Sequence, residues 1–98
     1  MHPKMKSLVP LRRRIEKLLS ERFNGSHDHV LISLTALLRI HITVVSPRFE
    51  GLTAEQKDDM VWMILEDQLK DEALYRIGMC VAMTPKEAVK FMPDLVTA

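Results

Sequence analysis

The stretch VVSPRFEGLTAEQKDD, residues Val44–Asp59, decides the fold because it joins a strand to a helix through residues that each favour a particular backbone conformation. Pro47 has no N–H to donate to a neighbouring strand, so the apolar run before it must end here. Gly51 offers a backbone position with positive φ. Thr53, followed three residues later by Gln56, forms a capping box that starts a helix. The stretch therefore predicts a strand, a tight turn and a helix in succession.

Three segments have the spacing of apolar residues that is typical of helices. They are residues 9–23, with Pro10 at the first helical position, residues 54–70 and residues 85–92. The last of these begins with a second capping box, formed by Thr84 and Glu87. Each predicted helix has an apolar face that must pack against something else.

Three other segments alternate apolar and polar residues with a period of two, which predicts strands at 30–34, 39–45 and 75–83. The short connection between the first two favours an antiparallel hairpin. A right-handed crossover through the second helix makes the third strand parallel to the second. The sequence thus predicts an α+β fold, a two-layer α-β-β-α-β-α sandwich whose three-stranded mixed sheet has its helices on one face.

The composition sets limits on the class of protein. With 98 residues, 47% of them hydrophobic and a net charge of +1, the chain predicts one domain at 9–92, a flexible basic N-terminus at 1–8 and a tail at 93–98. The single cysteine, Cys80, excludes an intramolecular disulfide and a multi-cysteine metal site. No segment resembles a membrane span or a secretory signal, so we expect a cytoplasmic protein with no membrane partner.

The quoted stretch also carries a resemblance to a known family. VVS at 44–46, FEG at 49–51 and TPKE at 84–87 resemble the BolA family, and the likeness extends over residues 9–88. The resemblance implies a class II KH-like fold. It also implies a small interaction domain whose partner is a monothiol glutaredoxin, with a role in iron–sulfur trafficking or regulation.

The chain departs from this family at the positions that hold an iron–sulfur cluster. Where the resemblance implies Arg-His-Arg, with the histidine as a ligand, this sequence has Lys57, Asp58 and Asp59. The connection Thr35–Arg39 contains no histidine or cysteine for a second ligand. A carboxylate is a hard oxygen donor, unlike the thiolate or imidazole that such clusters need. We therefore expect no cofactor held by this chain.

The predicted partner surface follows the quoted stretch and the helix after it. It consists of Arg48, Phe49, Glu50, Gly51, Lys57, Asp58 and Trp62. A structural explanation of the turn, in which Phe49 fills the core and Gly51 reverses the chain, is compatible with this function. Trp62 is adjacent to the apolar stripe of its helix, so we expect partial exposure and a role as an interface anchor.

Two other functions remain open. Nucleic-acid binding would use the basic residues of the first helix, namely Arg12, Arg13, Arg14 and Lys17, which follow Lys4 and Lys6. The G-x-x-G loop of KH domains is missing. Homodimerisation would use an open sheet face or the helix at 54–70. Because no carboxylate pair, catalytic triad or phosphate loop occurs, we expect no enzyme.

Isolated histidine, cysteine and methionine residues give weaker signals. His27 and His29 would share one face of a strand, as in some metal sites, whereas a solvated turn is the simpler interpretation. His41 is expected on the open sheet face, beside Thr43. Cys80 either fills the core or lies on that open face. We expect core positions for the methionines Met60, Met63, Met79 and Met83.

Overall fold

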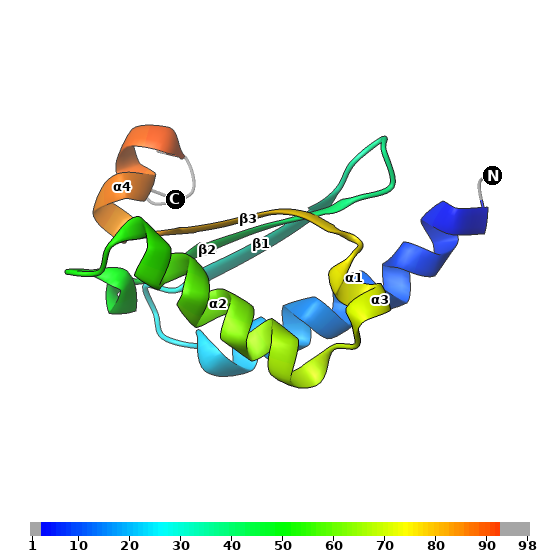
Figure 1. Cartoon of the computed structure of the whole chain (residues 1–98). Coiled ribbons are helices and arrows are strands. Elements are labelled where there is room, and N and C mark those ends of the chain that lie inside the picture. The colour runs from blue at the N-terminus through cyan, green and yellow to red at the C-terminus, as the bar shows by residue number, and fades with distance from the viewer. Residues whose placement is uncertain (1–2, 93–98) are drawn as a thin grey trace.

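The computed structural model describes residues 3–92, with side chains from residue 8 onward, and has an α+β fold (Figure 1). The elements are α1 (Pro3–Arg22), β1 (His29–Leu34), β2 (Ile40–Val45), the 3-10 helix η1 (Pro47–Phe49), α2 (Ala54–Gln68), α3 (Asp71–Leu74), β3 (Ile77–Met83) and α4 (Pro85–Phe91). The predicted α-β-β-α-β-α order is confirmed. Elements η1 and α3 are additions too short for periodicity to indicate.

The three strands form one mixed sheet in the order β1-β2-β3. β1 pairs antiparallel with β2, and Ile32 lies opposite Ile42. β3 runs parallel to β2, with Val44 opposite Ala82. This is the pairing that the handedness of the crossover through α2 predicts.

A bulge at Gly78 interrupts the pairing of β2 with β3. Ile40 pairs with Ile77, but the next residue of β2, His41, pairs with Met79. Gly78 is therefore an extra residue with no counterpart in β2. Because side chains alternate along a strand, one extra residue moves every later side chain of β3 to the other face.

The bulge corrects the predicted orientation of β3. Cys80 and Ala82 pack against the core, whereas Met79 is 47% exposed on the opposite face. Met83 shares that opposite face, since it lies at an even spacing from Met79. The expectation that Met79 and Met83 fill the core is wrong, because it assumed a regular strand.

The core lies between the sheet and the pair of helices α1 and α2. Ile15 and Leu19 of α1 and Val61 and Leu65 of α2 are all fully buried there. They meet the inward side chains of β2, among them Ile42. The helical spacing of these residues is what the sequence predicted for a two-layer sandwich.

α4 lies on the other side of the sheet from α1 and α2, at the Met83 end of β3 (Figure 1). Ala88 of α4 and Val45 of β2 are fully buried but do not belong to the main core cluster. The prediction of helices on one face is therefore correct for α1 and α2 and wrong for α4. Thr84 caps α4 directly after β3, so no connecting segment is available to bring this helix to the face that α1 and α2 cover.

α1 begins at Pro3, earlier than the predicted start at residue 9. Residues 3–8, expected to be flexible, are helical, and Leu8 is only 1% exposed. Pro10 lies inside the helix instead of at its first position and removes one backbone hydrogen bond there. Packing of the apolar face of α1 outweighs this local cost. The predicted tail at 93–98 lies outside the described residues.

Both predicted capping boxes are present. The Thr53 hydroxyl accepts a hydrogen bond from the backbone N–H of Gln56 at 3.1 Å, and the Gln56 side chain accepts one from the Thr53 N–H at 2.9 Å. Thr84 and Glu87 make the same reciprocal pair at the start of α4. These caps satisfy backbone donors that have no partner within the helix.

Candidate partner-binding surface

The turn after β2 is held together by its own side chains. Ser46 is fully buried, and its hydroxyl accepts a hydrogen bond from the backbone N–H of Arg48 at 3.1 Å. Phe49 is also fully buried and packs on Phe23, with 5.4 Å between ring centroids. Gly51 has φ of +81°, the left-handed conformation for which glycine was expected. Phe49 is thus a core residue whose ring offers no surface to a partner.

Arg48 lies at the surface and links the turn to the end of α1. Its Nη1 donates a hydrogen bond to the carbonyl oxygen of Arg22 at 2.6 Å. Its guanidinium lies 4.9 Å from the centroid of the Phe23 ring. A cation that donates to the last carbonyls of a helix also interacts favourably with the helix dipole. These two contacts attach the Arg48 side chain to the end of α1.

A groove with a mixed apolar and charged lining adjoins Arg48, between α2 and the end of α1. It has a volume of about 360 Å³ and is lined by Arg22, Arg48, Met60, Met63, Ile64 and Asp67. Met63 is 71% exposed, which corrects the expectation that it lies in the core. We call this surface the Arg48 groove. Sequence reasoning missed Met63 because it grouped the methionines together instead of assigning each one to a helix face.

The predicted partner residues do not all share this surface. Trp62 is half-buried against the core, as expected, but does not line the Arg48 groove. At about 100° per residue, Trp62 is turned roughly 200° around the axis of α2 from Met60. Arg48 and Trp62 therefore flank α2 on different sides. Glu50 is exposed in the turn.

Lys57 and Asp58, also predicted to contact a partner, have different environments. Lys57 is engaged in an ion pair within the chain, since its Nζ lies 2.7 Å from Oε1 of Glu87. This pair connects α2 to α4, and the hydrogen bond from Lys57 lowers the pKa of Glu87. Asp58 is exposed, and its negative charge acts on the thiol of Cys80.

The residues at the implied cluster positions do not fit an iron–sulfur cluster. Asp58 supplies an oxygen donor in the first half of α2, which follows the Val45 end of β2. The turn Thr35–Arg39 adjoins the other end of β2, so the two positions lie far apart on the sheet (Figure 1). Burial raises the pKa of the Cys80 thiol to about 12, which disfavours the thiolate that would bind iron.

The histidines do not form a metal site with other residues in the described part of the chain. His27 lies in a turn before β1, so it does not share a strand face with His29, contrary to the proposed pairing. Asp28, between them, accepts a hydrogen bond from the Gly25 N–H at 2.9 Å. The segment is therefore a solvated turn, the simpler of the two interpretations of His27 and His29. His41 lies opposite Ser33 of β1 and is half-buried.

The basic residues of α1 are exposed but do not form one face. Arg12, Arg13, Arg14 and Lys17 are all exposed. Arg12 and Arg14 are separated by about 200° around the helix axis. The Arg14 side chain contacts the end of α2, where its Nη2 donates a hydrogen bond to the carbonyl oxygen of Gln68 at 2.7 Å. Arg13, Arg14 and Lys17 fall within about 100° of one another around the axis, and Arg12 lies outside this arc.

The α-β-β-α-β-α order and the three-stranded mixed sheet are those of the BolA fold. The chain is similar in structure to BolA1 from Arabidopsis thaliana, with a TM-score of 0.60, 18% sequence identity and coverage of 79% of this chain and 94% of the other. No protein-family model and no curated protein matches the sequence. The likeness establishes a BolA-like fold for this chain. Within residues 3–92, no helix combines the length and apolar character needed to cross a membrane.

Proposed function

We propose that this chain is a small non-enzymatic interaction domain that binds a monothiol glutaredoxin through the Arg48 groove and contributes no ligand to an iron–sulfur cluster. The observation that supports docking here is the 71% exposure of Met63 in a groove that also contains Met60, Ile64 and Arg48. Methionine adapts its shape to a partner, and arginine is enriched among residues that dominate binding energy. The choice of glutaredoxin as the partner rests on the resemblance to BolA proteins.

Charge on the two sides of the groove gives the partner a preferred orientation. Arg22 and Arg48 line the side near the end of α1, and Asp67 lies on α2. Complementary charges steer a partner and fix its register more than they add affinity. We expect the glutaredoxin surface to place an acidic group near Arg48 and an apolar side chain over Met63.

Two residues support the proposal that this chain supplies no cluster ligand. Asp58 replaces the implied histidine, and Cys80 is held as a neutral thiol. Docking of this chain on a cluster-loaded glutaredoxin should therefore leave the visible absorption of the cluster unchanged. Docking and cluster coordination are therefore tested separately, docking by affinity and coordination by visible absorption.

The docking part is tested with two variants and one control. Met63→Asp and Arg48→Glu should each weaken binding of the glutaredoxin by about tenfold or more, because a desolvated anchor is lost or a charge is reversed. Val89→Asp, at an apolar residue of α4 that is 48% exposed, is the matched control and should bind like the parent chain. Affinity is measured by calorimetry, and folding of each variant by circular dichroism.

Four results contradict the proposal. Equal affinity for Met63→Asp and the parent chain would place the interface elsewhere, and weakening by Trp62→Ala alone would place it on the other flank of α2. A changed cluster spectrum in the complex would show that this chain supplies a ligand. No complex at all would contradict the choice of partner.

A weaker case exists for nucleic-acid binding through α1. Arg13, Arg14 and Lys17 share one side of the helix, but Arg12 lies on another side and Arg14 donates a hydrogen bond to the Gln68 carbonyl oxygen. A backbone of regularly spaced phosphates needs cations on one continuous surface. The geometry therefore favours partner docking at the Arg48 groove over nucleic-acid binding through α1.

A further inference from the structure

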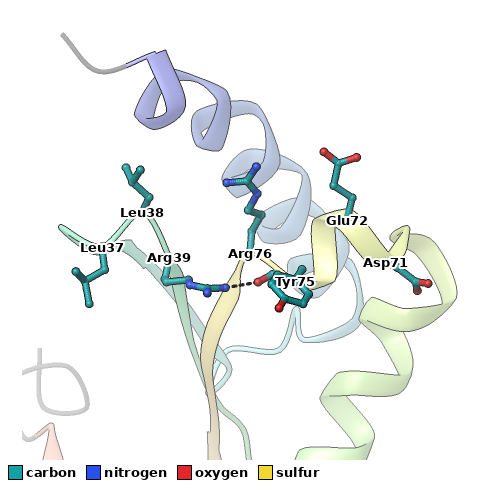
Figure 2. A pocket seen from close by; sticks show the side chains of 7 residues that line it. All are labelled: Leu37, Leu38, Arg39, Asp71, Glu72, Tyr75 and Arg76. Atoms are coloured by element: carbon teal, nitrogen blue, oxygen red, sulfur yellow. Dashed lines mark hydrogen bonds between the residues drawn. The ribbon is translucent and has the colours of Figure 1, made fainter.

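A trough separate from the Arg48 groove lies where α1, α3 and the β1–β2 turn meet. It consists of two adjoining hollows of about 610 Å³ and about 420 Å³, which share Glu72 and Arg76. Arg39 and Tyr75 line the larger hollow, shown in Figure 2. Arg14 and Lys70 line the smaller one. The two hollows therefore adjoin at Glu72 and Arg76.

The smaller hollow gathers cations from separate elements. Arg14 comes from α1, Lys70 precedes α3, and Arg76 precedes β3. Among the described residues the one ion pair joins Lys57 and Glu87, so none of these three cations is paired with a carboxylate. Glu72 is the single carboxylate among the residues that line the hollow. This excess of positive charge favours an anion with several acceptor oxygens, such as a phosphate.

The larger hollow presents an exposed aromatic ring. Tyr75 is 77% exposed, and the guanidinium of Arg39 lies 5.6 Å from its ring centroid. Nη1 of Arg39 also donates a hydrogen bond to the Tyr75 carbonyl oxygen, the dashed line in Figure 2. An exposed aromatic ring is a platform on which a planar base can stack.

The backbone beside this ring is strained. Leu38 has φ of +61°, a conformation that costs a residue other than glycine roughly 1–2 kcal/mol. The Thr35 hydroxyl, which accepts from the backbone N–H of Leu37 at 3.3 Å and of Arg39 at 3.2 Å, holds the turn in this shape. The turn leaves Leu37 84% exposed at the edge of the trough. Such strain concentrates at ligand-binding sites.

We propose that this trough binds a nucleoside phosphate, with the phosphate on Arg14, Lys70 and Arg76 and the base against Tyr75. The carboxylate of Glu72, which lines both hollows, would accept hydrogen bonds from the ribose hydroxyls. The required chemistry is an aromatic base joined to a phosphate. A free nucleotide and the 5′-terminal nucleotide of a single strand both supply it. None of these residues lines the Arg48 groove, so this proposal is independent of the glutaredoxin proposal.

The first measurement is a titration of the ¹⁵N-labelled protein with AMP, followed by amide chemical shifts. We expect saturable shifts concentrated in residues 70–76 and 37–39. Adenosine and inorganic phosphate, each carrying half of the chemistry, should bind more weakly than AMP. A 5′-phosphorylated hexanucleotide distinguishes the two sources: tighter binding than AMP indicates the end of a strand, and weaker binding indicates a free nucleotide.

Matched variants then assign the two ends of the trough. Lys70→Gln should weaken AMP binding about fivefold to tenfold through loss of a charge-assisted bond, whereas Lys90→Gln, at an exposed lysine of α4, should not. Tyr75→Ala should weaken binding of AMP and of adenosine to a similar extent. Phe91→Ala, at an aromatic residue of α4 that is 73% exposed, is its control.

Either of two outcomes would overturn the proposal. AMP at millimolar concentration could cause no saturable shift in the residues of the trough. Alternatively, the control variants could weaken binding as much as Lys70→Gln and Tyr75→Ala, which would show non-specific attraction. The amide spectrum of each variant reports its folding in the same experiment.

Discussion

Cys80 shows how the local shape of the sheet controls the chemistry of one side chain. The bulge at Gly78 turns Cys80 toward the core, where burial, followed by the charge of Asp58, raises the pKa of the thiol to about 12. A cysteine on the open face would keep a pKa nearer 8.5. The side chain therefore behaves as a small apolar residue and not as a nucleophile.

This predicts slow alkylation of the folded protein. At pH 8, iodoacetamide should modify Cys80 at least roughly 1000-fold more slowly than in the unfolded chain, because the thiolate fraction falls by that factor when the pKa rises from about 8.5 to about 12. Rates are measured by mass spectrometry with and without denaturant. Similar rates in both states would show that the thiol is accessible.

The same shift makes folding stability depend on alkaline pH. The unfolded chain loses the thiol proton above about pH 8.5, whereas the folded chain retains it up to about pH 12. The contribution of Cys80 is therefore fully present below pH 8.5 and is lost as the pH rises through this window. A Cys80→Ala variant should have a flatter stability profile there.

At the scale of an element, Gly78 determines the register of β3. A Cβ atom at this position would lie 2.9 Å from Cβ of Arg39, closer than carbon atoms approach each other. Any larger residue must displace either the β1–β2 turn or the bulge. The orientation of Met79 and Cys80 therefore depends on a residue that has no side chain.

Gly78→Ala should accordingly lower the free energy of unfolding by about 1–3 kcal/mol, the usual cost of overpacking. Arg39→Gly removes the Cβ atom that the new methyl group would contact. In the Arg39→Gly background, Gly78→Ala should therefore lower the free energy of unfolding by markedly less. Both costs are measured by urea denaturation. An equal cost in the two backgrounds would contradict the assigned contact.

At the scale of the whole molecule, one ion pair connects elements on the two sides of the sheet. Lys57 belongs to α2, which covers the core face, and Glu87 belongs to α4, which lies on the other side. Glu87 also caps α4 by accepting a hydrogen bond from the Thr84 N–H at 2.9 Å. One carboxylate thus fixes both the start of α4 and its attachment to α2.

Glu87→Gln should destabilise the protein near neutral pH, and the difference should disappear in acid. The hydrogen bond from Lys57 lowers the pKa of Glu87, so its contribution is present above the unfolded pKa of about 4.3 and is lost as the pH falls through the lower folded value. Because the Glu87 side chain is 43% exposed, solvent screening keeps the effect small. Thermal unfolding at pH 7 and pH 3 measures it, and an equal deficit at both values would exclude the charge as its cause.

The sequence by itself determined the order of elements, the two capping boxes, the end of β2 at Ser46-Pro47 and the turn at Gly51. These features depend on residues close together in the chain, through proline and glycine geometry and through the period of apolar residues. It also indicated Arg48 and Asp58 as residues of interest, from the resemblance to BolA proteins.

Only the tertiary structure decided which faces and surfaces these residues share. The bulge at Gly78, the face of α4, the burial of Phe49 and the separation of Trp62 from Arg48 all depend on contacts between elements distant in sequence. A one-residue change in register moves the side chains of a strand to the opposite faces of the sheet. A helix places neighbouring residues on different sides of its axis. Local patterns therefore predict the elements, whereas the sites arise from the packing of the elements against one another.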